Sequence, residues 1–191
     1  MRRQLIVPAL ALALALAALS ACGSTDSGSS GAGSSSPRAS GEETQRLEAT
    51  DRSFTVEVPK SWKNESERAK KPAVMAAQGT EETLDQLIIT SYATARGAES
   101  AAAFVVTGLS GSGTPCERLE KSTAFGGERL VFDCPSETKK TEGTEGTKFR
   151  RLFFPVEHEG RSFLLLVQTP GASLEATAPV VKPVLESLTF P

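Results

Sequence analysis

Few side chains in this sequence have the chemistry that catalysis or metal binding needs. The one histidine, His158, lies between Glu157 and Glu159 and is followed by Gly160. Because a glycine after charged residues is typical of a turn, we expect His158 to be solvated rather than a general base or a metal ligand. The sequence has no nucleophile elbow and no phosphate-binding loop. It therefore predicts no catalytic residue, no metal site and no cofactor.

The cysteine nearest the N-terminus lies in a distinctive setting. Leu19-Ser20-Ala21-Cys22 follows Arg2, Arg3 and an apolar run of about 15 residues, shorter than the ~20 that a membrane-spanning helix needs. This N-terminus resembles that of bacterial prolipoproteins, in which the lipobox cysteine receives a diacylglyceryl group and the preceding peptide is removed. The resemblance implies a lipoprotein signal peptide at residues 1–21 and lipidation of Cys22. The alternative is an ordinary secretory signal cut before Cys22, which leaves a free thiol.

Cys116 and Cys134 are the other two cysteines. An exported chain meets an oxidising environment, so we expect a disulfide between them, with two unpaired thiols as the alternative. A disulfide that closes a loop of this size would stabilise the folded protein by about 3 kcal/mol in the chain-entropy model. Direct cross-strand pairing needs a turn centred on Phe125, whereas Gly126 and Gly127 predict a centre slightly later.

Residues 22–43 read as a lipidated cysteine followed by a flexible linker rich in serine and glycine. About 20 such residues have an end-to-end distance of roughly 25 Å, so the folded part would stay close to the lipid headgroups. Residues 44–191 suit one globular domain. Without residues 1–21 the chain has 19 basic and 23 acidic residues, a net charge near −4. This balance argues against nucleic acid as a partner and leaves membrane association to the acyl chains.

Alternating apolar residues predict a mainly antiparallel sheet. Leu87-Ile88-Ile89 and Phe163-Leu164-Leu165-Leu166-Val167 are apolar on both faces, so we expect them in central strands. Pro155 predicts a bulge or an edge. Trp62, after the strand-ending Pro59, is expected to cap the core. The expected strands lie at residues 46–50, 54–58, 73–78, 84–92, 130–134, 148–158 and 162–169, with a further strand at Cys116.

Two segments have helical periodicity. Residues 98–109 repeat apolar side chains at helical spacing and end before Gly111. The C-terminal segment has one apolar stripe, and Pro179 and Pro183 predict a kinked or late-starting helix there. The stripe consists of Leu174, Ala178, Val181, Leu185 and Leu188.

The charged loop at residues 136–147 is the best candidate for a recognition surface, although a merely solvated loop would have the same composition. Its candidate binding residues are Lys139, Lys140, Glu142 and Glu145.

Both ends of the domain resemble a known family. Residues 54–62, FTVEVPKSW, and residues 179–190, PVVKPVLESLTF, are similar to the opening strand and closing helix of the PsbP/Mog-like proteins. The resemblance implies an α+β fold for residues 44–191: a mainly antiparallel central sheet with helices packed on it, an α/β/α sandwich. Similar domains occur in bacterial surface lipoproteins and in accessory proteins of larger complexes, and are generally not enzymes.

The sequence therefore predicts a lipoprotein anchored to the cell membrane, on its extracytoplasmic face. Its expected function is that of a non-catalytic binding or assembly module with a protein partner in the cell envelope. The alternative is a small envelope hydrolase or a carrier of an apolar ligand, which would need a pocket between sheet and helix.

Overall fold

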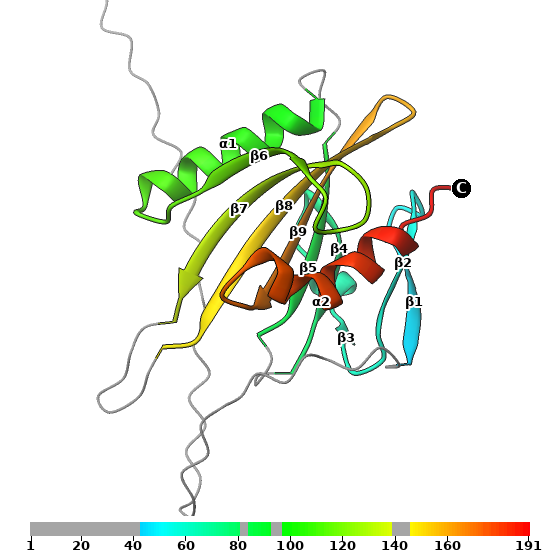
Figure 1. Cartoon of the computed structure of the whole chain (residues 1–191). Coiled ribbons are helices and arrows are strands. Elements are labelled where there is room, and N and C mark those ends of the chain that lie inside the picture. The colour runs from blue at the N-terminus through cyan, green and yellow to red at the C-terminus, as the bar shows by residue number, and fades with distance from the viewer. Residues whose placement is uncertain (1–42, 81–83, 93–96, 139–145) are drawn as a thin grey trace, which may run out of the picture. The chain divides into compact units, whose positions relative to one another are not determined.

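A seven-stranded antiparallel sheet is the centre of the fold (Figure 1). The computed structural model describes residues 43–80, 84–92, 97–138 and 146–191. The strands follow the order β3-β4-β5-β9-β8-β7-β6 across the sheet. They are β3 (Lys63–Asn64), β4 (Ala73–Gln78), β5 (Gln86–Tyr92), β6 (Glu117–Ser122), β7 (Arg129–Glu137), β8 (Lys148–His158) and β9 (Arg161–Pro170).

One helix covers each face of this sheet. Helix α1 (Gly97–Gly111) contacts β7, β8 and β9 on one face, and α2 (Leu174–Ser187) packs on the other. The hairpin of β1 (Thr44–Glu48) and β2 (Thr55–Pro59) joins the α2 side. The predicted α+β sandwich with a mainly antiparallel sheet is therefore confirmed (Figure 1).

The larger core cluster fills the space between the sheet and α2. Trp62 is 2% exposed and belongs to it, as its position after Pro59 predicts. Strand residues alternate between the two clusters, so that Val131 faces α2 while Phe132 faces α1. The largest side chains of the α2-side cluster are Phe54, Trp62, Met75, Phe125, Phe154 and Phe163, and the α1-side cluster centres on Ala102, Phe132, Cys134, Phe153 and Leu164.

Strand β9 occupies the middle of the sheet, as its apolar sequence predicts, and β5 lies beside it. The prediction for Pro155 was wrong in part. Its strand β8 is internal, and its register with β9 continues through Pro155 without a bulge. Pairing with β7 ends at Phe153, so Pro155 lies where one side of β8 has no neighbouring strand and no amide donor is required.

Both predicted helices are present. Helix α1 begins at Gly97, where Glu157 of β8 accepts a hydrogen bond from the Ala98 amide at 2.9 Å. Helix α2 does not start late: Ser173 caps it by accepting a hydrogen bond from the Ala176 amide. The helix accommodates Pro179 and Pro183 because both lie on its exposed side, where water can satisfy the carbonyls that lack an amide partner.

Two segments near the start of the domain differ from the sequence prediction. The first strand begins two residues earlier than expected, at Thr44. The charged stretch after Trp62, for which no element is predicted, contains the short strand β3 and a 3-10 turn, η1 (Ser66–Arg68).

Within the described residues, no helix is both long and apolar enough to span a bilayer.

Candidate functional site

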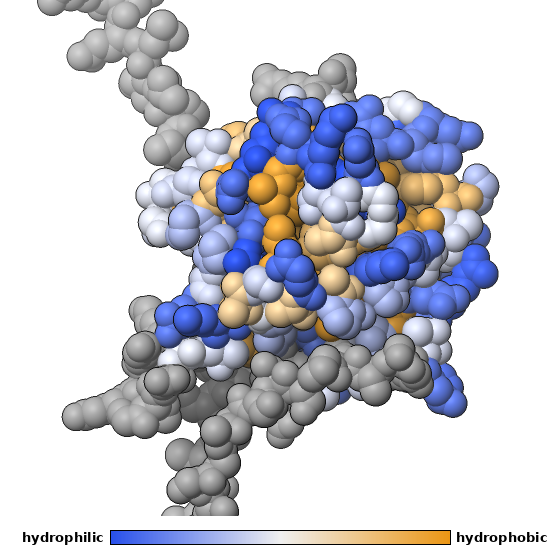
Figure 2. Space-filling model, viewed as in Figure 1, coloured by the Kyte–Doolittle hydropathy of each residue, from blue (hydrophilic) through white to orange (hydrophobic). Residues whose placement is uncertain are grey.

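A groove lies between the β6–β7 turn and the first turn of α2. Its volume is about 530 Å³ and it is open to solvent on the α2 side of the molecule. We call it the α2 groove and define it by its lining residues, which are Leu119, Glu120, Lys121, Ser122, Thr123, Ala124, Leu174 and Glu175. Figure 2 looks onto this side and shows apolar residues gathered near its middle with hydrophilic residues around them. The groove thus combines apolar walls with a charged rim.

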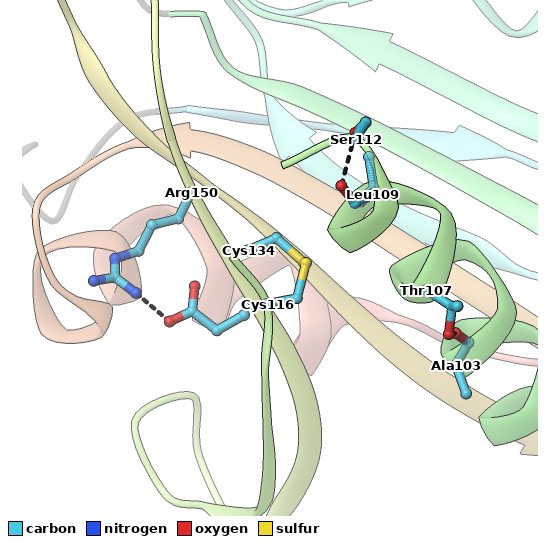
Figure 3. The surroundings of a disulfide bond; sticks show 8 residues. Ala103, Thr107, Leu109, Ser112, Cys116, Cys134 and Arg150 are labelled. Carbon is cyan, nitrogen blue, oxygen red and sulfur yellow. Dashed lines mark hydrogen bonds and ion pairs between the residues drawn. A yellow bond between two sulfur atoms is a disulfide. The ribbon is translucent and has the colours of Figure 1, made fainter. Parts of the chain in front are cut away.

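The disulfide between Cys116 and Cys134 fastens one wall of the groove, with a Cα–Cα distance of 4.2 Å. Glu117 pairs with Asp133, so the two cysteines lie directly opposite each other. A register shift between Leu119 and Ser122 explains the later turn centre that the glycines predict, because β6 contains one extra residue near the turn. Figure 3 shows the disulfide on the α1 side of the hairpin, where Cys134 is buried.

The turn of the same hairpin packs into the core on the α2 side of the sheet. Phe125 is fully buried and meets the ring of Phe154 edge-on, with 5.4 Å between the centroids. The Arg129 side chain donates a hydrogen bond to the Gly126 carbonyl at 3.3 Å. The turn beside the groove is therefore held by core packing and is not a free surface loop.

A buried ion pair connects strands β7 and β8 to the segment before α2. Arg150 of β8 pairs with Asp133 of β7, and their side chains are 16% and 7% exposed. Arg150 also donates a hydrogen bond to the Ala172 carbonyl at 2.9 Å, in the segment before α2. Sequence reasoning missed this pair, although Asp133 was detectable as the one charge in the apolar run Leu130–Cys134. Such a charge, buried on a strand, requires a partner.

The electrostatics differ between the buried ion pair and the exposed rim of the groove. Burial raises the pKa of the Asp133 carboxyl, the Arg150 guanidinium opposes this rise, and Glu117 across the ladder adds to it. Hydrogen bonds from its own backbone amide and from Ser173 lower the pKa of Glu175 on the exposed rim. The rim has both charges, because Lys121 lies on it together with Glu120 and Glu175. Lys121 also forms an ion pair with Glu128 at 3.4 Å.

We expect the Asp133→Asn variant to show this raised pKa as a pH dependence. In the folded protein the carboxyl holds its proton above the ordinary value of 3.8, so its contribution to stability decreases as pH rises through that raised pKa. The unfolding free energy of the wild type minus that of Asp133→Asn should therefore be smaller at pH about 7 than at pH about 3. Urea denaturation across this range measures it, and a difference that grows with pH would contradict the assignment.

His158 is not the solvated turn residue that the sequence predicts. Its ring stacks on Phe190 with 4.2 Å between the centroids and 13° between the planes, and its Nε2 is buried without a hydrogen-bond partner among the described residues. The C-terminal segment brings Phe190 there by pairing Thr189 with Thr55. Because this contact joins distant parts of the chain, the local sequence around His158 could not reveal it.

The His158→Ala variant should lose this stack and with it about 1 kcal/mol of stability. The loss should be accompanied by faster amide exchange at Thr189, whose N–H bonds to the Thr55 carbonyl at 2.9 Å. Glu159→Gln, at the exposed turn, is the matched control and should change stability by less than about 0.5 kcal/mol. Equal effects of the two substitutions would show that the stack does not stabilise the C-terminal segment.

The other predicted site residues are not covered by the described part of the structure. Cys22 and the candidate binding residues Lys139, Lys140, Glu142 and Glu145 lie outside the described residues. The base of their loop is closed by Thr138, whose amide donates to the Thr147 carbonyl at 3.0 Å. Among residues 43–80, 84–92, 97–138 and 146–191, no three potential metal ligands cluster.

Comparison with solved structures identifies the fold. The Ran-binding protein Mog1p of Saccharomyces cerevisiae is 12% identical; the match covers 78% of this chain and 96% of that one, with a TM-score of 0.52. Cyanobacterial PsbP from Synechocystis is 13% identical, with coverages of 86% and 98% and a TM-score of 0.48. A crystal structure from Bacteroides thetaiotaomicron is 10% identical over 76% of this chain, which spans only 48% of that chain, with a TM-score of 0.46.

No protein-family model matches the sequence, and no curated protein matches it. The similarity to Mog1p shows the fold alone, which is the α+β sandwich described above. The residues of the α2 groove are therefore interpreted from their own geometry.

Proposed function

We propose that this protein is a non-catalytic binding or assembly module, tethered through acyl chains on Cys22 to the extracytoplasmic face of the cell membrane. In this proposal the α2 groove contacts a protein partner in the cell envelope. The observation that carries the proposal is that an open groove of about 530 Å³ is bordered by a hairpin fixed on both faces. A surface that is already ordered loses little conformational entropy when a partner binds.

The shape of the groove favours a protein partner over an enclosed small ligand. The space between sheet and α2 is filled by buried side chains, including Phe125, Phe154 and Val181. A carrier of an apolar ligand would need that space, because such ligands are mostly enclosed by their binding sites. The charged rim, with Lys121 and Glu175, is typical of the polar border of protein interfaces.

The setting of His158 weighs against the hydrolase alternative. The ring is stacked on Phe190, and the neighbouring Glu157 is committed to the Ala98 amide of α1. A general base must reach the proton that it removes from the substrate. The His158 imidazole instead packs on the Phe190 ring, which itself lies against the α2-side core cluster. The same fold occurs in Mog1p, a Ran-binding protein, which is one example of a binding role for it.

The tether is supported by the sequence and by the disulfide. The lipobox cysteine directly precedes the Gly/Ser-rich linker, and a disulfide is typical of a protein that folds outside the cytoplasm. Fractionation of cells that express the wild type or Cys22→Ser tests this part. We expect the wild type in the membrane fraction and the variant in the soluble fraction. A variant that stays on the membrane would contradict the lipid anchor.

Site-specific crosslinking in cells tests the groove. A photoreactive residue replacing Glu175 lies on the rim of the groove, and one replacing Ser100 lies on α1, which packs on the opposite face of the sheet. Both positions are exposed. We expect the probe at residue 175 to capture one envelope protein that the probe at 100 does not. Equal capture at both positions, or none at 175, would overturn the assignment of the groove.

A further inference from the structure

Strand β6 is an edge of the sheet that is open to pairing. It bonds to β7 on one side, and no other strand of the described residues bonds to it. A Cα–Cα distance of 4.2 Å between Cys116 and Cys134 is typical of a non-hydrogen-bonded antiparallel pair. The backbone groups of Cys116, and of Arg118 two residues later, therefore point away from β7. They are hydrogen-bond donors and acceptors that a further strand could use.

The sequence of β6 is complementary to itself when two copies run antiparallel. If Leu119 faces Leu119 of a second copy, Arg118 faces Glu120 and Glu117 faces Lys121. Each opposite-charge pair then occurs twice across the two-fold axis.

Neighbouring registers lack this complementarity. A shift of the axis to Arg118 or to Glu120 places that charge opposite itself. An axis between Leu119 and Glu120 places Arg118 opposite Lys121, and one between Arg118 and Leu119 places Glu117 opposite Glu120. Like charges directly opposite each other destabilise a strand pair. The Leu119 register is therefore selected by charge.

We propose that two copies of this protein pair through β6, antiparallel about Leu119, so that their sheets become one continuous sheet. Arg118 already lies between two carboxylates of its own chain, Glu99 at 2.6 Å and Glu120 at 2.8 Å. On pairing it exchanges its own Glu120 for that of the second copy and keeps Glu99. The register shift with β7 between Leu119 and Ser122 falls at Glu120 and Lys121, so the new ladder extends no further than Lys121.

A ladder this short gives a weak dimer. A stable complex usually buries about 800 Å² on each partner, which one short strand does not supply. The association is therefore measured on concentrated protein, up to about 1 mM, where a complex with a dissociation constant in that range is populated. The membrane tether of the proposed function would add to the local concentration, but the pairing itself does not depend on it.

Charge reversal tests the register. The full chain is secreted as its Cys22→Ser form, and its association is measured by sedimentation equilibrium. Arg118→Glu alone and Glu120→Arg alone place like charges across the axis, so each should dimerise at least tenfold more weakly than the Cys22→Ser parent. An equimolar mixture of the two restores opposite charges in every pair and should associate like the parent. Unchanged association of the single variants, or a mixture that stays monomeric, would overturn the proposal.

Covalent trapping provides an independent readout. In the Leu119 register, a Leu119→Cys variant brings the two new thiols directly opposite each other, within disulfide range. Oxidation should join two chains through these thiols much faster than through Glu67→Cys, an exposed control position on η1. Equal crosslinking rates, or a parent protein that remains monomeric, would mean that the charges of β6 serve only to protect an edge. Leu119, Glu120 and Lys121 also line the α2 groove, so the two proposals share one surface. Self-association of the purified chain and capture of an envelope protein at residue 175 are different readouts, so a failure of this inference is distinguishable from a failure of the proposed function.

Discussion

Replacing Arg150 by methionine should cost about 3 kcal/mol of folding free energy, because it leaves the Asp133 carboxylate buried without its counter-charge. The substitution also removes the hydrogen bond to the Ala172 carbonyl, which links β8 to the segment before α2. Chemical denaturation of purified Arg150→Met gives the free energy directly. A matched exposed substitution, Arg68→Met on η1, should change stability by no more than about 0.5 kcal/mol.

The double variant Asp133→Asn/Arg150→Met separates the charge effect from lost packing. With both charges removed, no buried carboxylate lacks a partner, so the double variant should be more stable than Arg150→Met by about 1 kcal/mol or more. If the double variant instead loses the sum of the two single losses, the two side chains act independently, and the ion pair does not hold β7 and β8 together.

Removing the disulfide with Cys116→Ala/Cys134→Ala should also cost about 3 kcal/mol, since the unfolded chain regains the freedom of an 18-residue separation. Cys134 is fully buried against the α1-side cluster, and alanine there also leaves a small void. Denaturation of the oxidised wild type and of the double variant measures the loss.

Hydrogen exchange locates the effect of the lost disulfide. Amides of β6 should exchange faster in Cys116→Ala/Cys134→Ala, while those of the central strand β9 keep their relative protection. The Cys22→Ser protein is the control for cysteine removal as such. A loss below about 1 kcal/mol, with unchanged exchange in β6, would mean that core packing of the turn through Phe125 holds the hairpin without the disulfide.

Features of the fold that depend on short-range patterns could be predicted from the sequence. The alternation in Phe54–Val58, the apolar run Phe163–Val167 and the stripe of α2 identify elements because each repeats with the period of its structure. The prolines of α2 predicted a kinked or late-starting helix, and the late start was wrong. Their cost depends on whether they face solvent, and the local sequence does not define that face without the rest of the fold.

The site depends mostly on contacts between distant residues, and the sequence indicated little of it. Asp133 and Arg150 meet only because β7 and β8 are neighbours in register, and Phe190 reaches His158 only through the Thr55–Thr189 bridge. The disulfide was the exception, because the domain has only two cysteines in its sequence and the N-terminus resembles an export signal, which leaves few alternatives. The groove itself arises where the β6–β7 turn and α2 come together, which no local pattern encodes.

In-cell crosslinking of the wild-type protein, followed by mass spectrometry of what co-purifies, tests the central claim most directly. The control is the Cys22→Ser form, which should keep the folded domain but lose the tether. We predict one stoichiometric cell-envelope protein with the wild type and its loss with Cys22→Ser. Recovery of the protein with no such companion, or with the same companion in both forms, would contradict a membrane-tethered binding module.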